Sequence, residues 1–160
     1  MTLELHDTLT GTKKPLVTTE PGHARMYVCG PTVYSHSHIG HAKSYVAFDV
    51  IVKWLRKSGF NVRYVQNITD VGHLTDNADQ GEDKIEKRAR LDRVHPLELV
   101  DMYMFSYMED MAALGVARPN MWVRATQHIP EQIELTAKLI ERGHAYVAGG
   151  NVYFDVASWS

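Results

Sequence analysis

Residues 26–41 read MYVCGPTVYSHSHIGH, and this segment holds the end of an apolar strand, a turn and the start of a helix. Its first residues are apolar and are followed by Gly30-Pro31, which predicts a short buried strand that ends at Cys29. In parallel α/β folds, ligands bind where the strands end. The turn after Cys29 is therefore the first place to look for a site.

A helix and a second strand follow this turn. Helical spacing of apolar residues, with Gly59 as a stop signal, is seen at Ala47, Ile51, Trp54 and Leu55. Residues 61–66 then alternate between polar and apolar, which predicts a strand that runs out towards Asp70. Strands joined by a helix of this length are expected to be parallel, with a right-handed crossover. The sequence thus predicts an α/β protein containing half of a Rossmann-like nucleotide-binding fold.

The segments on either side of this unit predict a lead-in and a helical insertion. Residues 1–23 have no sustained period and are expected to be irregular or hairpin-like, whereas the polar and acidic residues 75–83 predict a mobile surface loop. Helices are expected near residues 84–91 and from Pro96 to just before Gly115. The second of these carries a stripe of Met and Leu at helical spacing, which we assign to the core.

The last thirty residues predict one more helix and a β-hairpin. Residues 130–142 place Ile133, Ala137 and Ile140 on one face of a helix. Two short alternating runs, 144–147 and 152–156, flank an Ala-Gly-Gly-Asn turn. A hairpin that directly follows a helix leaves the predicted half-sheet without further strands, so we expect exposed apolar surface.

The composition fits one globular domain over residues 1–160. Seventeen basic and nineteen acidic residues leave a net charge of −2, so contact with a nucleic acid must be local rather than driven by overall charge. The single cysteine excludes an internal disulfide framework and is typical of a reducing compartment. No export signal is visible, and no apolar run approaches the roughly 20 residues that cross a bilayer. We expect a cytoplasmic protein with no membrane span.

Three histidines, His36, His38 and His41, lie in the turn and the first residues of the helix. Because His38 and His41 are three residues apart at a helix N-terminus, both rings are expected to face the positive end of the helix dipole. Two imidazole donors there would stabilise charge on a triphosphate as pyrophosphate leaves, and Gly40 lets a nucleotide approach the backbone. The pattern predicts adenylyl transfer.

Other interpretations of the same residues are open at this stage. A lone histidine is most often a hydrogen-bonded, partly buried side chain, and a lone Cys29 is most often an inert core thiol. His-x-x-His with His36 and Cys29 nearby also has the donor types of a Zn²⁺ site. No C-x-x-C, H-E-x-x-H, P-loop or G-x-G-x-x-G motif occurs, which excludes the common zinc-finger, zincin, kinase-like and dinucleotide-binding classes.

The segment from Met26 to Tyr34, followed by His38-Ile39-Gly40-His41, resembles the opening of the cysteinyl-tRNA synthetases. Four more matching segments follow in the same order: Tyr64 to Asp70, Arg124-Ala125-Thr126, Gly143 to Tyr146, and Asn151 to Asp155. Agreement of several separate segments in one order is far more specific than the His-Ile-Gly-His element alone. The resemblance covers most of the chain.

The resemblance implies a class I aminoacyl-tRNA synthetase that activates cysteine with ATP and transfers it to tRNA(Cys). It implies that His38 and His41 contact ATP and stabilise the adenylation transition state, with Gly30, Thr32 and Gly40 lining the same pocket. The complete enzyme would be a monomer.

The resemblance also implies a zinc site for the amino acid. Cys29 would be one of four Zn²⁺ ligands, the metal would bind the substrate thiolate directly, and Thr69 would lie near the substrate. A soft metal gains a thiolate bond that the hydroxyl of serine does not match, so no editing domain is needed.

Three departures from the family pattern stand out. Residues 71–74 and the acidic insertion replace the usual paired aspartates, and Ser35 and Val123 replace an aspartate and a proline. The third departure is length, because the other zinc ligands, the K-M-S-K-S loop and the anticodon-binding helices would follow Ser160. Two alternatives are therefore carried forward: a cysteine ligase with a small-amine acceptor, and a non-catalytic fragment that binds a nucleotide or a partner.

Overall fold

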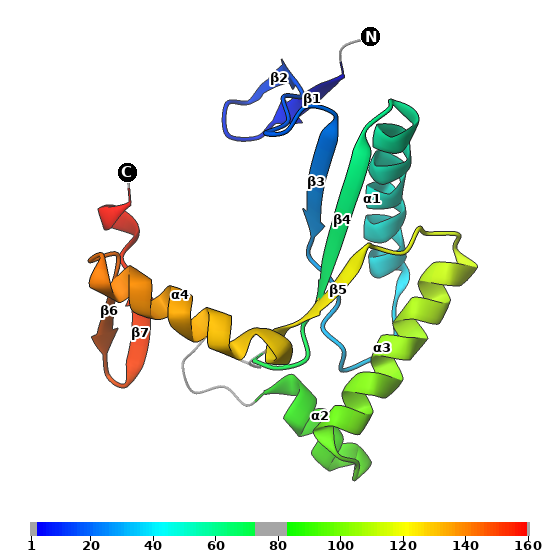
Figure 1. Cartoon of the computed structure of the whole chain (residues 1–160). Helices are drawn as coiled ribbons and strands as arrows, with labels where there is room; N and C mark the ends of the chain where they lie inside the picture. The colour runs from blue at the N-terminus through cyan, green and yellow to red at the C-terminus, as the bar shows by residue number, and fades with distance from the viewer. Residues whose placement is uncertain (1–2, 73–82, 160) are drawn as a thin grey trace.

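The structure is a computed structural model that describes residues 3–72 and 83–159. The surface loop expected at residues 75–83 therefore lies outside the described residues, except for Asp83. A three-stranded parallel sheet forms the centre, in the order β3 (His23–Val28), β4 (Asn61–Ile68) and β5 (Met121–Arg124) (Figure 1). The first two strands and their parallel pairing confirm the prediction, and β5 was not predicted.

The crossover between β3 and β4 is the helix α1 (Ile39–Lys57). It buries Tyr45, Asp49, Val52 and Leu55 against the sheet. It ends at Ser58, after which Gly59 adopts a φ of 89°, a left-handed conformation that favours glycine. The predicted order of strand, helix and strand is confirmed.

Two helices connect β4 to β5. The helix α2 (Lys84–Asp92) begins at Asp83, whose carboxylate accepts a hydrogen bond from Ile85 N at 2.7 Å. The helix α3 (Pro96–Ala113) begins after His95 with proline in its first turn. Its buried residues include Val100, Met104 and Met111, so the assignment of the methionine stripe to the core is confirmed.

The helices α1 and α3 share one face of the sheet. Tyr45, Val52, Tyr107 and Met111 from these helices form one cluster with Val62 and Tyr64 of β4. On the opposite face, the strand register places Tyr27, Val65 and Met121 in one row. Tyr27 is 59% exposed and Met121 43% exposed, so this face is largely open to solvent, as expected of a half-sheet.

The C-terminal segments extend away from the sheet (Figure 1). A short 3-10 helix (Ala125–His128) leads into α4 (Ile129–Glu141), which is followed by the hairpin of β6 (Ala145–Ala148) and β7 (Asn151–Phe154). The hairpin is confirmed, but Val156 starts another 3-10 helix (Val156–Ser158) instead of ending a strand. The cause is local, because the Asp155 side chain accepts a hydrogen bond from Ala157 N at 3.0 Å and turns the chain.

The N-terminal lead-in is a hairpin of β1 (Glu4–Asp7) and β2 (Thr12–Pro15). The apolar face predicted for α4 is present, but it is exposed to solvent. Ile133 on this face is 65% exposed. None of the helices in the described ranges is both long and apolar enough to span a bilayer.

Candidate functional site

The loop after β3 and the end of β4 are held together by backbone hydrogen bonds. Thr32 and Thr69 form an isolated parallel bridge. Thr69 N donates to Pro31 O at 3.0 Å, and Val33 N donates to Thr69 O at 3.3 Å. Two segments that are far apart in sequence, and that both contain predicted site residues, therefore meet at the carboxyl end of the sheet, where an α/β fold binds its ligands.

The Asn67 side chain fixes this junction. Its Oδ1 accepts a hydrogen bond from Gly30 N at 2.5 Å, and its Nδ2 donates to the Thr69 hydroxyl at 3.0 Å. One amide thus sets the position of both predicted residues. Sequence reasoning did not single out Asn67, because a lone Asn within a strand pattern gives no signal of a non-local hydrogen bond.

His38 and His41 cap the N-terminus of α1 reciprocally. His38 Nδ1 accepts a hydrogen bond from Gly40 N at 3.1 Å, while His41 Nδ1 accepts one from His38 N at 3.2 Å. The ring centroids are 4.0 Å apart with a 32° tilt. The pair is therefore built into the helix terminus, as the three-residue spacing predicted, and it satisfies two of the backbone donors that a helix start leaves without partners.

This capping assigns the protons on both rings. Because each Nδ1 accepts from a backbone N–H, each neutral ring carries its proton on Nε2. Burial, and then the neighbouring His38, lower the pKa of His41 below its usual 6.5. His41 is thus neutral at pH 7, and both rings present an Nε2–H donor beside the positive end of the helix dipole.

A cavity of about 250 Å³ adjoins this pair. Gly30, Thr32, His38 and His41 line it together with Pro31, Tyr34, Ser35 and Lys84. Gly40, Thr69 and Cys29 belong to the same region but are not among its lining residues. Lys84, at the start of α2, was missed by sequence reasoning; its ammonium lies 5.6 Å from the centroid of the Tyr34 ring. Imidazole donors, a cation and a helix N-terminus are the groups that bind phosphates.

His36 points to a different partner. Its Nδ1 lies 2.8 Å from the Ser106 hydroxyl, and its ring packs edge-on against Tyr103 at 5.0 Å. His36 therefore ties the loop before α1 to α3. The alternative of a zinc site made of His36, His38, His41 and Cys29 fails, because no group of three or more His, Cys, Asp or Glu is placed to hold a metal within residues 3–72 and 83–159.

Cys29 is exposed and free, which contradicts the interpretation of an inert core thiol. The reason is its place in the sheet. Cys29 directly follows the last residue of β3 and lies two residues after Tyr27, so both side chains are on the open face of the sheet. Its backbone carbonyl accepts a hydrogen bond from the Tyr45 hydroxyl at 3.3 Å. An accessible thiol at a strand end is available as a metal ligand.

A parallel half-sheet with two histidine donors at the start of its first crossover helix, beside a small polar cavity, is the arrangement of a class I aminoacyl-tRNA synthetase nucleotide-binding half. The chain belongs to the family described as tRNA synthetases class I (C) catalytic domain, whose model matches residues 15–160.

Individual relatives agree with this membership. The chain is 60% identical to the cysteine–tRNA ligase of Chlorobaculum tepidum, over 98% of this chain and 33% of that protein. It is 56% identical to the cysteine–tRNA ligase of Deinococcus radiodurans, over 98% of this chain and 32% of that protein. The chain thus spans about a third of the length of these curated relatives.

A solved structure supports the fold. The methionyl-tRNA synthetase of Mycobacterium tuberculosis, in complex with methionyl-adenylate, matches with a TM-score of 0.63 and 21% identity. The match covers 77% of this chain and 23% of that one. At this identity the likeness concerns the fold, and it confirms the predicted Rossmann-like architecture.

Proposed function

We propose that the chain is the N-terminal catalytic part of a cysteine–tRNA ligase, which activates cysteine with ATP and transfers the cysteinyl group to tRNA(Cys). The observation that carries the proposal is the pair of Nε2–H donors of His38 and His41 beside a cavity at the carboxyl end of the sheet. The relatives with this name match along nearly the whole chain.

In the first step, a carboxylate oxygen of cysteine attacks the α-phosphorus of ATP. A new P–O bond forms, the bond to the β-phosphate oxygen breaks, and pyrophosphate leaves. Negative charge grows on the phosphate oxygens as this happens, and the two Nε2–H donors stabilise it without having to lose or gain a proton. The Lys84 ammonium adds a positive charge on the same cavity. Gly30 and Thr32 line its wall, and Gly40 lies in the first turn of the helix that holds both rings.

Cysteine is proposed to bind on the open face of the sheet, near Thr69. The exposed Cys29 thiol suits a soft metal, and we assign it as one ligand of a Zn²⁺ ion whose other ligands lie outside residues 1–160. When bound, such an ion selects a thiolate over a hydroxyl. The Cys29→Ala variant of the complete protein is expected to lose stoichiometric zinc, measured by metal analysis, while Ser35→Ala keeps it. Equal zinc in both variants would remove Cys29 from the ligand set.

The adenylation step is tested by cysteine-dependent exchange of labelled pyrophosphate into ATP, measured on the complete protein. Substitutions can separate the two nitrogens of His41. Asn places an acceptor near the position of Nδ1 and keeps the cap, whereas Gln places a donor near Nε2. We expect His41→Asn to lower exchange by about 10²-fold with the fold intact, and His41→Gln to lose less. Two results would overturn the proposed roles: the same exchange rate with serine as with cysteine, or the same exchange rate in His41→Asn and His41→Gln.

The acceptor is tested separately. AMP release that depends on both cysteine and tRNA(Cys) supports the ligase, whereas release with cysteine and a small amine alone would favour the small-amine ligase. ATP binding without exchange would favour the non-catalytic fragment. The proposal places the complete enzyme in the cytoplasm, a reducing compartment that suits a single free cysteine, and takes it to be a monomer.

A further inference from the structure

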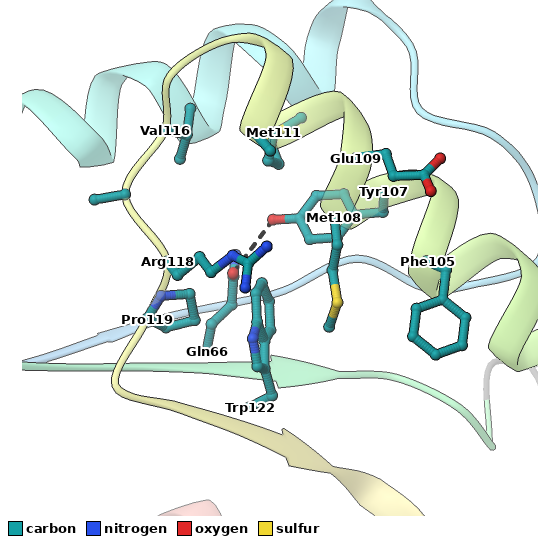
Figure 2. Close-up of a pocket in the computed structure, with 12 residues that line it drawn as sticks. Gln66, Phe105, Tyr107, Met108, Glu109, Met111, Val116, Arg118, Pro119 and Trp122 are labelled. Atoms are coloured by element: carbon teal, nitrogen blue, oxygen red, sulfur yellow. Dashed lines mark hydrogen bonds between the residues drawn. The ribbon is translucent and has the colours of Figure 1, made fainter.

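A second cavity, of about 350 Å³, lies on the face of the sheet that α3 covers (Figure 2). It opens between α3, the loop that follows this helix and the start of β5, and none of its lining residues lines the cavity beside His38 and His41. Its walls are largely apolar and include the Trp122 indole, the Phe105 ring and the thioethers of Met108 and Met111. A site of this size holds a molecule of one or two rings.

The cavity contains a buried polar group without a partner. Gln66 is 1% exposed, and its Oε1 accepts a hydrogen bond from the Tyr107 hydroxyl at 3.2 Å. Its Nε2 has no hydrogen-bond partner. A buried N–H donor left unsatisfied costs about 1–3 kcal/mol, so an acceptor atom brought to this amide by a ligand would recover that cost.

A cation lines the same cavity. Figure 2 shows the Arg118 side chain extending from the loop after α3 into the cavity, towards Gln66 and Trp122, whereas the carboxylate of Glu109 points away from Arg118. Arg118 forms no ion pair with any residue in the described part of the chain. Guanidinium groups bind planar carboxylates through two parallel hydrogen bonds.

We propose that this cavity is a second binding site, which takes a small aromatic carboxylate. The Arg118 guanidinium pairs with the carboxylate, and the Gln66 Nε2–H donates to one of its oxygens. The aromatic body packs against Trp122 and the methionine thioethers, which make favourable contacts with rings. The site is separate from the proposed adenylation site and does not depend on that function.

The test uses the complete protein and two matched probes, naphthalene-2-carboxylate and its neutral carboxamide, with binding measured by titration calorimetry in saturating ATP. We expect the carboxylate to bind at least tenfold more tightly than the carboxamide. Arg118→Gln should abolish this preference, and the control Arg56→Gln, which alters an exposed arginine at the end of α1, should keep it. Ala112→Phe places a large side chain in the cavity from an exposed position on α3, and it should weaken the binding of both probes.

Pyrophosphate exchange should be unchanged in the Arg118→Gln variant. No saturable binding, equal affinity for the two probes, or a preference that survives Arg118→Gln would each overturn the proposal. Displacement of the carboxylate by ATP would also overturn it, because the probe would then occupy the nucleotide cavity. Loss of exchange activity in the wild type would concern the proposed ligase function alone.

Discussion

A Cβ atom placed on Gly30 would lie 1.6 Å from the backbone oxygen of Asn67, far inside any van der Waals contact. The same two residues are joined by the hydrogen bond from Gly30 N to Asn67 Oδ1. The end of β3 thus lies directly against the end of β4, and only glycine fits between them. This close approach is what brings Thr32 and Thr69 into register at the site.

Gly30→Ala is therefore expected to destabilise the protein by about 2–3 kcal/mol, because the obstructing atom is backbone and cannot rotate away. The measurement is the free energy of unfolding in urea. Gly22→Ala is the matched control: it has open space around the added methyl but a φ of 76°, so its cost is expected to be about 1 kcal/mol. A Gly30→Ala variant as stable as the control would show that the strand ends can separate freely.

Gly40→Ala should separate the position of the His38 ring from the stability of the fold. The added Cβ would lie 2.9 Å from the His38 ring, a side chain that can move, and Ala is the better helix former. We expect a free energy of unfolding within about 1 kcal/mol of the wild type and pyrophosphate exchange lowered by about tenfold or more. Unchanged exchange would mean that His38 contributes nothing through its present position.

The sequence predicted those parts of this site that depend on local spacing. The pairing of His38 and His41 follows from helical periodicity, and the parallel strands follow from the length of the connecting helix. The strand β5 was missed because no turn signal joins it to a neighbouring strand, as the Ala-Gly-Gly-Asn turn does for the equally short β6 and β7. Its start depends on Asn120, whose N and Oδ1 each pair at 2.7 Å with the backbone of Tyr64, 56 positions away.

Tertiary placement explains the remaining misses. Lys84 reaches the cavity only because α2 packs beside the loop that carries Tyr34. The exposure of Cys29 depends on one face of the sheet being uncovered, which no pattern of a single strand reveals. Neighbours of this kind are set by contacts between distant segments, and local periodicity carries no information about them.

Lys84 provides a prediction about ATP affinity. Lys84→Met keeps the apolar stem and removes the charge, so we expect the KM for ATP in pyrophosphate exchange to rise by about fivefold or more. Lys87→Met, one turn further along α2 and outside the cavity, serves as the control and should leave this KM unchanged. A rise in both variants would point to overall charge rather than to a local contact.

The lowered pKa of His41 makes stability depend on pH. The folded protein binds a proton at His41 less readily than the unfolded chain does, so stability is fully present above about pH 6.5 and falls as the pH drops through the lowered folded pKa. We expect unfolding in urea to show a shallower loss of stability between about pH 6.5 and 5 in His41→Asn than in the wild type.

The cause of this shift is checked by ring titration in NMR. His38→Asn removes the neighbouring imidazole, the smaller of the two causes, so the pKa of His41 should move part of the way back towards 6.5. A pKa of His41 at or above 6.5 in the wild type would contradict both the shift and the assignment of a neutral donor.

Asp70 and Thr126 link the ends of β4 and β5. The buried Asp70 carboxylate accepts hydrogen bonds from Thr126 N at 3.0 Å and from the Thr126 hydroxyl at 2.5 Å.

Asp70→Asn places an NH₂ group against one of these two donors, so we expect the free energy of unfolding to fall by about 2–3 kcal/mol. Thr126→Val keeps the backbone donor and loses only the hydroxyl, so we expect about 1 kcal/mol. Unfolding in urea should give this order, and a Thr126→Val loss equal to that of Asp70→Asn would mean that the backbone hydrogen bond contributes little. This carboxylate matters for the site because Asp70 directly follows Thr69. Its hydrogen bonds to Thr126 fix the start of the 3-10 helix that leads into α4.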